Sequence, residues 1–247
     1  MNTLNIQRFP PLSYGCSEAV NTLCTNLSFS GAGVKKIMIT SSHSSEGKSF
    51  LSMNIMRTLA KLGKTVVLVD ADLRRSTITT DFSLQFDSEQ PPGLAHYLAG
   101  LANESDVIYS TNVMGAYMIP VGWSVSNSLP LLASPRFDTL LQTFASKADY
   151  VIVDAPPLGL VIDAAEIAKH CDGAVIVVSY DDVRRQELLD VKEQLEHTEC
   201  PILGTVLNMV KYDDYLSKKY YYKPHYSAGY SAYNPTNKQN IGKHPLP

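Results

Sequence analysis

The chain has 247 residues, a formal net charge of −3 and 45% hydrophobic residues, which suits one large α/β domain with a sizeable core. This charge gives no general attraction to nucleic acid or to anionic membranes. No apolar run approaches the ~20 residues that span a bilayer, and residues 1–11 lack the pattern of a signal peptide. The four cysteines are scattered without a C-x-x-C pair, which argues against a zinc site and favours reduced thiols in the cytosol.

The N-terminal region is predicted to be an arm followed by a helix. Residues 1–16 contain several turn formers and little periodicity, so we expect an arm or linker there. Ser17 and Glu18 suit a helix start, and apolar residues up to Phe29 recur on one face. Because this helix precedes the first core strand, we expect it to pack on the outside of the domain or against a neighbouring subunit.

Residues 36–49 have the order of a phosphate-binding loop, namely an apolar strand, a small polar loop and a helix. A helix N-terminus offers unpaired backbone N–H groups and the positive end of the helix dipole to anionic oxygens. Lys48 is then suited to reach the β- and γ-phosphates, and the Ser49 hydroxyl to coordinate Mg²⁺.

This Walker A pattern is imperfect, because Ser42 occupies the position of its first glycine. Serine is small enough for close approach but lacks the easy access of glycine to positive φ. On this stretch alone, a second interpretation stays open, in which Ser44 or Ser45 simply caps a helix after a serine-rich turn.

A second apolar run, residues 65–69, ends in Asp70 and Asp72. An apolar run this continuous indicates a strand covered on both faces, as in a parallel sheet. Such sheets bind ligands at the carboxyl ends of their strands. The two aspartates either begin a polar loop or serve the Mg²⁺ site, and their closeness to that site favours the second interpretation.

The remaining elements complete an alternation of strands and helices. Residues 81–92 are predicted to form a loop and 93–100 a short helix, in which His96 lacks a partner at a recognisable spacing and is interpreted as structural. Further strands are predicted at 116–122, 150–153, 174–178 and 202–208. Three further helices are predicted. The first begins at Ser134, the second has Asp163 as its N-cap, and the third spans residues 184–196.

Two of these strands end in candidate site residues. Asp154 follows a buried strand in the arrangement of a Walker B motif, whose carboxylate meets the hydration shell of Mg²⁺. Asn208 ends the last strand and is available to a nucleotide base. The alternation predicts a doubly wound, mostly parallel α/β sheet over residues 17–211.

The C-terminal segment, residues 212–247, differs in kind from the rest. Tyrosines cluster there among Lys, Ser, Gly and Pro without a period that would bury them, so we expect a disordered tail. Three interpretations stay open at this point: an aromatic tail without function, a platform for stacking nucleic-acid bases, and a cluster of phosphate acceptors. The tyrosines are Tyr212, Tyr215, Tyr220, Tyr221, Tyr222, Tyr226, Tyr230 and Tyr233.

Together these stretches resemble the bacterial tyrosine kinases (BY-kinases) of capsule and exopolysaccharide biosynthesis over about residues 17–233. Residues 40–49 match the Walker A motif of the family, 67–75 its Walker A′ motif and 150–157 its Walker B motif. Residues 93–100 and 204–208 also match in order and spacing. Walker A′, paired with Walker A and a tyrosine-rich tail, is specific to this group, whose fold is a P-loop NTPase fold related to MinD and ParA.

The resemblance implies roles for individual residues in the use of ATP and Mg²⁺. Asp70 is the implied base or positioner for the attacking tyrosine hydroxyl, Asp72 its neighbour, and Asp154 a ligand to Mg²⁺-bound water. The implied nucleotide-binding residues are Ser44, Ser45, Glu46, Gly47, Lys48, Ser49, Phe50 and Asn208. The implied catalytic residues are Lys48, Asp70 and Asp72, and the implied metal site consists of Ser49, Asp70 and Asp154. The implied acceptors are Tyr215, Tyr220, Tyr221, Tyr222, Tyr226, Tyr230 and Tyr233.

The resemblance also implies partners. Members phosphorylate their own tail tyrosines between subunits of a ring, act with a transmembrane polysaccharide co-polymerase that activates them, and are reversed by a cognate phosphatase. We expect a cytoplasmic chain recruited to the inner face of the membrane by a separate activator, with no nucleic-acid partner. The Glu-x-x-Arg-x-x-Arg motif that supports the ring retains Glu18, but Asn21 and Cys24 replace its arginines, so we expect weaker self-association.

Two rival functions remain from the sequence. A MinD/ParA-type ATPase shares the fold, but it needs a second loop lysine, and His43 stands at that position. A nucleotide-binding pseudokinase scaffold is consistent with Ser42 and the missing arginines. A eukaryotic-type kinase is excluded, because the sequence has no His-Arg-Asp or Asp-Phe-Gly signature.

Overall fold

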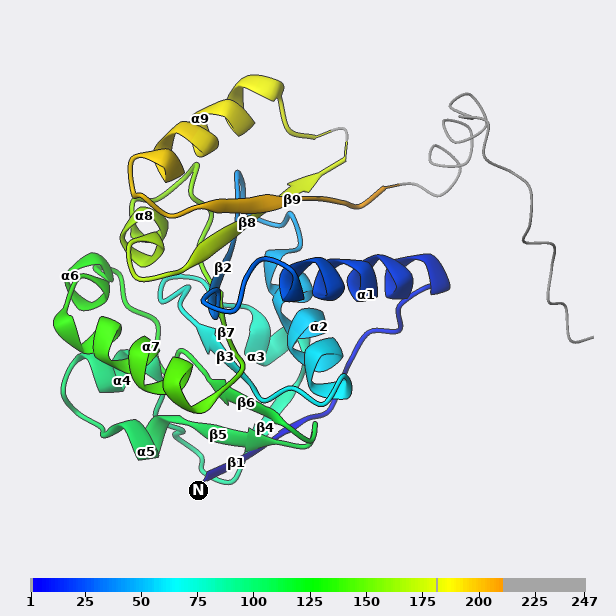
Figure 1. Ribbon diagram of the computed structural model, residues 1–247. Coiled ribbons are helices and arrows are strands. Elements are labelled where there is room, and N and C mark those ends of the chain that lie inside the picture. The colour runs from blue at the N-terminus through cyan, green and yellow to red at the C-terminus, as the bar shows by residue number, and fades with distance from the viewer. Residues whose placement is uncertain (1, 181, 211–247) are drawn as a thin grey trace, which may run out of the picture. The chain divides into compact units, whose positions relative to one another are not determined.

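The computed structural model describes residues 2–180 and 182–210. In these residues one nine-stranded sheet runs in the order β4-β1-β5-β6-β3-β7-β2-β8-β9 (Figure 1). The strands are β1 Asn2–Ile6, β2 Lys36–Ser41, β3 Val66–Asp70, β4 Leu84–Phe86, β5 Tyr109–Thr111, β6 Ala116–Ile119, β7 Tyr150–Asp154, β8 Gly173–Ser179 and β9 Ile202–Asn208. The helices are α1 Tyr14–Ser28, α2 Lys48–Lys61, α3 Ile78–Asp81, α4 Leu94–Leu98, α5 Glu104–Val107, α6 Leu129–Leu132, α7 Pro135–Lys147, α8 Asp163–Ala168 and α9 Arg185–Glu196.

The six strands predicted from the sequence form one continuous parallel region, β6-β3-β7-β2-β8-β9. Because all six run the same way, their carboxyl ends meet at one edge of the sheet. Asp70 at the end of β3 lies directly opposite Asp154 at the end of β7. The predicted fold class, a doubly wound and mostly parallel sheet, is confirmed.

Helices cover both faces of this parallel region, which explains its continuous apolar runs. On β3, Val67 and Val69 belong to the core under α4, α7, α8 and α9, whereas Val66 and Leu68 belong to the core under α1 and α2. Figure 1 shows α1 and α2 on one side of the central strands and α7 on the other. Alternate side chains therefore enter two separate cores.

The arm predicted for residues 1–16 is wrong where it includes residues 2–6, because these form β1. This strand pairs antiparallel with β4 and parallel with β5, and it buries Leu4 and Ile6. β4 likewise lies within the predicted loop 81–92. Both strands are too short for their alternation to stand out in the sequence.

Two helix starts differ from the prediction. Helix α1 begins at Tyr14, earlier than Ser17, because the Ser13 hydroxyl accepts a hydrogen bond from the Cys16 backbone N–H. Asp163 is the first residue of α8 and not its N-cap. Its carboxylate instead bonds Arg74 and Ser128.

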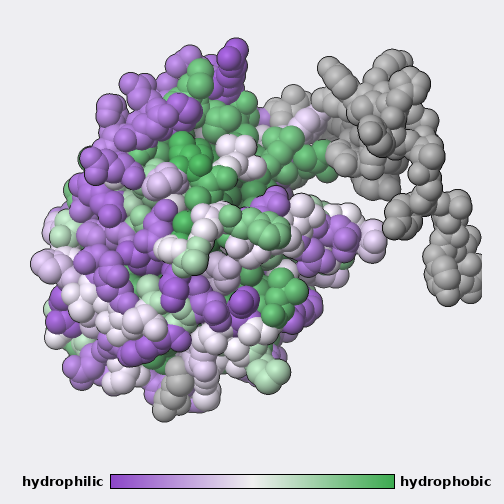
Figure 2. Space-filling view, viewed as in Figure 1, coloured by the Kyte–Doolittle hydropathy of each residue, from purple (hydrophilic) through white to green (hydrophobic). Residues whose placement is uncertain are grey.

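The surface of the domain differs between α9 and β9. Figure 2 shows mostly hydrophilic colour over α9 and hydrophobic colour along β9. Leu207 of β9 and Met209, which follows the strand, are more than half exposed. Within the described ranges, no helix combines the length and the apolar character needed to cross a membrane. The predicted tail and its tyrosines, residues 212–247, lie outside the described residues.

Candidate active site

The P-loop joins β2 to α2 at the carboxyl edge of the sheet. Two of its residues adopt left-handed backbone conformations, Ser45 at φ 66° and Gly47 at φ 87°. A Cβ atom on Gly47 would lie only 2.2 Å from the Asn208 side-chain nitrogen. A side chain at position 47 would strain the left-handed backbone and displace the Asn208 amide, which favours glycine there.

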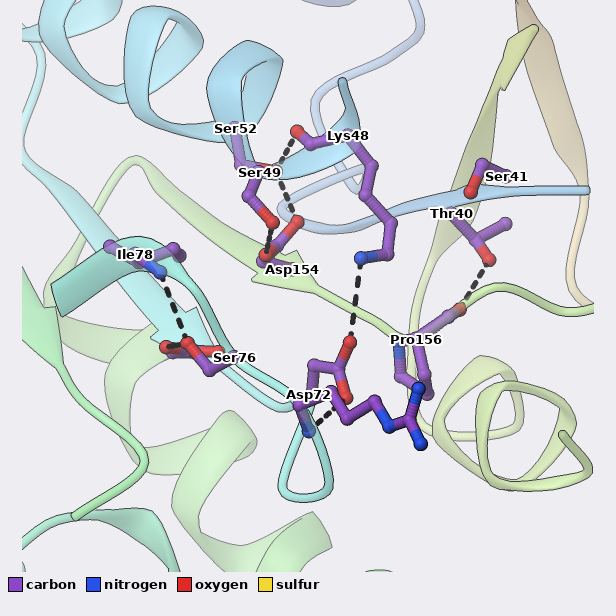
Figure 3. Close-up of polar contacts among 12 residues, drawn as sticks. Thr40, Ser41, Lys48, Ser49, Ser52, Asp72, Ser76, Ile78, Asp154 and Pro156 are labelled. Carbon is purple, nitrogen blue, oxygen red and sulfur yellow. Dashed lines mark hydrogen bonds and ion pairs between the residues drawn. The ribbon is translucent and has the colours of Figure 1, made fainter. Parts of the chain in front are cut away.

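Asp154 sits beneath the start of α2 and accepts two hydroxyl hydrogen bonds. The Ser49 Oγ donates to its Oδ2 at 2.6 Å, and the Ser52 Oγ to its Oδ1 at 2.9 Å (Figure 3). Ser49 and Ser52 are three residues apart, so both face the same side of the helix. The carboxylate is only 1% exposed, which places it within reach of a cation bound by the Ser49 hydroxyl.

Lys48 points across the site to Asp72, with 3.4 Å between its Nζ and the Asp72 Oδ2 (Figure 3). Both side chains are at least nine-tenths buried. The other Asp72 oxygen accepts the Arg75 backbone N–H at 3.1 Å. Lys48 thus links the P-loop to the Walker A′ segment.

Asp70 has the least satisfied carboxylate of the site. Its Oδ2 accepts a hydrogen bond from the Ser76 hydroxyl, but its Oδ1 is buried and has no partner among the described residues. Burial, followed by the charge of Asp154, holds the pKa of Asp70 well above its usual value. Such a carboxylate retains a proton more readily than an exposed one.

The site carries more negative than positive charge. Among these four described residues, three carboxylates (Asp70, Asp72 and Asp154) stand against the one ammonium group of Lys48, so the ionised set carries two excess negative charges. Burial also raises the pKa of Asp154, although Lys48 and its serine donors oppose this. A divalent cation would balance this excess charge, and oxygen donors suit Mg²⁺. The described residues contain no cluster of three or more His, Cys, Asp or Glu placed to hold a metal alone.

Comparisons with known proteins identify the family. Residues 37–223 match the model of the CobQ/CobB/MinD/ParA nucleotide binding domain. The tyrosine-protein kinase CpsD of Streptococcus pneumoniae is 36% identical over 191 residues, which cover 77% of this chain and 83% of CpsD. CpsD of Streptococcus agalactiae is 37% identical over 203 residues, which cover 80% of this chain and 87% of that protein. This chain belongs to the bacterial tyrosine kinases.

A solved structure agrees with this assignment. The kinase domain of the Escherichia coli tyrosine kinase ETK matches with a TM-score of 0.74 and 28% identity, over 87% of this chain and 80% of that domain. The relatives confirm the kinase interpretation of the sequence, and the family model confirms a nucleotide-binding domain.

The structure brings together five of the predicted site residues of the kinase at the carboxyl edge. Lys48, Ser49 and Asp154 meet at the start of α2, and Asp72 contacts Lys48. Asp70 lies opposite Asp154 in the register of β3 and β7. Their contacts are consistent with the predicted site, while their individual roles remain predictions.

Other predicted nucleotide-binding residues contribute differently. The Glu46 side chain is buried and bonds two backbone N–H groups of the kinase itself. The Phe50 side chain is partly buried and packs against the core under α2. Ser44 and Ser45 are exposed in the loop, and the Asn208 Nδ2 donates to the Glu46 carbonyl at 2.8 Å.

Sequence reasoning missed three contributors to the site. Ser52 could have been found from its position three residues after Ser49, on the same helix side. Ser76, whose hydroxyl donates to Asp70, lies six residues later in an irregular loop, and no sequence pattern predicts this hydrogen bond. Arg74 grips the buried carboxylate of Asp163 with two hydrogen bonds, at 2.6 and 3.1 Å, and so fixes the Walker A′ segment.

The electrostatics of Asp163 match this structural role. Burial raises the pKa of Asp163, but hydrogen bonds from Arg74 and Ser128 outweigh burial and hold that pKa below its usual value. The ion pair therefore stays charged at neutral pH, and it connects the loop after β3 to the start of α8. The Arg74 guanidinium also donates to the Ser126 carbonyl at 2.7 Å.

Proposed function

We propose that this kinase transfers the γ-phosphoryl group of ATP to tyrosines of its own C-terminal segment and thereby regulates capsular or exopolysaccharide synthesis and export. The observation that carries the proposal is the buried Asp70 oxygen without a partner, beside a P-loop lysine and a serine-bound Asp154. Membership of the bacterial tyrosine kinases supports the reaction class.

The nucleotide and the metal have separate sets of ligands in this proposal. Lys48 and the backbone N–H groups of residues 44–50 hold the phosphates of ATP, and the side chain of Asn208 contacts the adenine. Ser49, Asp154 and Asp70 would hold the Mg²⁺, which would supply positive charge to neutralise the β- and γ-phosphates. The orphaned Asp70 oxygen and the excess of carboxylates fit such an ion.

Asp70 also acts on the acceptor. A tyrosine hydroxyl with a pKa of ~10 is mostly protonated at neutral pH. As its oxygen bonds to the γ-phosphorus and the bond to ADP breaks, the proton passes to the Asp70 carboxylate. Its raised pKa makes Asp70 a better proton acceptor than an exposed aspartate. Asp72, held by Lys48 and the Arg75 N–H, keeps the neighbouring segment in place.

The proposed acceptors are the clustered tyrosines beyond the described residues. These tyrosines stand close together in the sequence, so one site can serve several of them in turn. The acceptors are Tyr215, Tyr220, Tyr221, Tyr222, Tyr226, Tyr230 and Tyr233.

The proposed partners follow the family. A transmembrane polysaccharide co-polymerase activates the kinase and recruits it to the inner face of the membrane, and a tyrosine phosphatase reverses its phosphorylation. Self-association is weak, because Asn21 is exposed but uncharged and Cys24 is buried against the domain core. A stable octamer at micromolar concentration in light scattering would refute this last point.

One observation favours a pseudokinase scaffold as the second candidate. The Ser42 hydroxyl, at the position of the first Walker A glycine, is buried and has no partner among the described residues. If this hydroxyl obstructs the phosphates, the chain would bind its partners without transferring phosphate.

Phosphotyrosine mapping by mass spectrometry tests the proposal. The wild type, Lys48→Met and a chain ending at residue 211 are each incubated with ATP and Mg²⁺. We expect phosphate on the C-terminal tyrosines of the wild type and none on Lys48→Met. An unmodified wild type that binds ATP, even with the cytoplasmic segment of its activator added, would establish the scaffold instead.

A further inference from the structure

Glu46 is a buried P-loop carboxylate that pairs with no cation among the described residues. It is only 1% exposed, and none of the ion pairs among the described residues includes it. Each of its oxygens instead accepts one backbone N–H, from His43 at 2.7 Å and from Ser179 at 2.9 Å. Backbone N–H donors alone satisfy this charge.

These two donors belong to different parts of the fold. His43 stands three residues earlier in the same loop, and Ser179 is the last residue of β8. The Glu46 carbonyl accepts the Asn208 side-chain amide from the end of β9 at 2.8 Å. One residue thus connects the P-loop to itself and to two neighbouring strands.

The residues on either side of Glu46 show why the loop needs such connections. Ser45 and Gly47 both have positive φ angles, 66° and 87°. A serine at positive φ is sparsely populated and persists only where the surrounding contacts hold it. Without the Glu46 contacts the loop would return to commoner conformations, and its N–H groups would no longer converge on an anion.

We propose that Glu46 is a positioning residue, whose side chain holds the P-loop in its phosphate-binding conformation before nucleotide arrives and does not itself touch the nucleotide. A loop that is already ordered loses less conformational freedom when it binds. The inference rests on the proposed nucleotide binding, which it deepens by assigning the order of the loop to one side chain.

The direction of the change in nucleotide affinity distinguishes a positioning role from a purely electrostatic effect of the Glu46 charge. A carboxylate near a phosphate site repels the phosphates, so loss of its charge alone would tighten nucleotide binding. Loss of a positioning residue weakens binding. In Glu46→Gln one oxygen still accepts an N–H, but the new amide group faces the second N–H and leaves it unpaired.

Asp172 provides a matched control. One of its oxygens accepts the backbone N–H groups of Lys35 and Lys36, at 3.0 and 2.8 Å. These contacts lie at the amino end of β2, whereas the P-loop follows the carboxyl end of the same strand. The other oxygen of Asp172 pairs with the Lys36 Nζ at 3.4 Å. Asp172→Asn therefore disturbs a carboxylate that also accepts two backbone N–H groups, but away from the site.

The experiment measures the dissociation constant of a fluorescent Mg·ADP analogue for the full-length wild type and three variants. We expect affinity at least tenfold weaker for Glu46→Gln, also weaker for Glu46→Asp, and within twofold of the wild type for Asp172→Asn. Glu46→Asp keeps the charge but is one methylene shorter, so it decides the matter if circular dichroism shows that Glu46→Gln does not fold.

Three results would overturn the proposal. Unchanged or tighter binding by Glu46→Gln, or by Glu46→Asp in its place, would exclude the positioning role and leave the proposed kinase function intact. An equal loss in Asp172→Asn would show a general effect on stability. A wild type that fails to bind the analogue would refute the proposed function and this inference together.

Discussion

The site has two neighbouring corners, each formed by an aspartate at the end of a strand, and the two aspartates differ in their hydrogen-bond partners. Asp154 ends β7 and Asp70 ends β3, and the two lie opposite each other in register and are each 1% exposed. Asp154 accepts a hydroxyl on each oxygen, whereas Asp70 accepts one hydroxyl and leaves its other oxygen without a partner. Among the described residues, the first corner has a donor for each carboxylate oxygen, while the second has a donor for only one.

This difference has an energetic meaning. A buried polar group without a partner costs about 1–3 kcal/mol of stability, and the raised pKa of Asp70 reflects the same unfavourable environment. Enzymes commonly keep such unfavourable groups where their chemistry needs them. We therefore propose that the Asp154 corner mainly positions the metal and that the Asp70 corner mainly accepts the proton.

The largest difference between the two corners is expected in the Mg²⁺ concentration that the Asp154→Asn variant needs for tyrosine phosphorylation. An amide is a poorer acceptor for Mg²⁺-bound water, and loss of such an outer partner weakens metal binding about 10- to 100-fold. The Mg²⁺ concentration that gives half-maximal tyrosine phosphorylation should rise by that factor, with much of the rate recovered at high Mg²⁺. A half-saturating concentration within twofold of the wild type would contradict the assigned role of Asp154.

A smaller effect is expected in the stability of the ligand-free protein. Asp70→Asn removes a buried charge with an unpartnered oxygen, so the free energy of unfolding should rise by about 1 kcal/mol at pH 8. Urea denaturation measures this change. Asp154→Asn serves as its control and should bring no gain, because both Asp154 oxygens already have donors.

The gain from Asp70→Asn should depend on pH with a definite sign. Folding raises the pKa of Asp70 above its ordinary value of 3.8, so the protonated carboxyl stabilises the folded state below that value. This contribution is lost as pH rises through the raised pKa. The two proteins should therefore be closer in stability at pH 5 than at pH 8, and a gap that widens towards acid would contradict the cause given for the shift.

The sequence was sufficient to predict the parallel region of the sheet, but not the three strands β4, β1 and β5 at one side of it. The strands β2, β3, β7 and β8 are buried along their whole length and read as continuous apolar runs. β4 and β5 have three residues each, and β1 has five next to a proline-rich stretch. Such short strands are defined by their partners in the sheet, and a single sequence does not reveal that pairing.

The same distinction applies to the site. Lys48, Ser49, Asp70 and Asp154 were predictable because each stands directly at the end of a strand or the start of a helix. The orientation of Glu46 depends on the positions of β8 and β9, which no local pattern contains. Local chemistry thus predicts which residues reach the edge, while packing decides where their side chains point.

The most direct test of the account is the single-turnover rate of tyrosine phosphorylation by Asp70→Asn, measured across a range of Mg²⁺ concentrations with ATP in excess. The account predicts a rate about 10²- to 10⁴-fold below the wild type, the usual loss when a general base is removed. It also predicts that added Mg²⁺ does not restore this rate, although ATP remains bound. Recovery of the wild-type rate at high Mg²⁺ would contradict the account and reduce Asp70 to a second metal ligand.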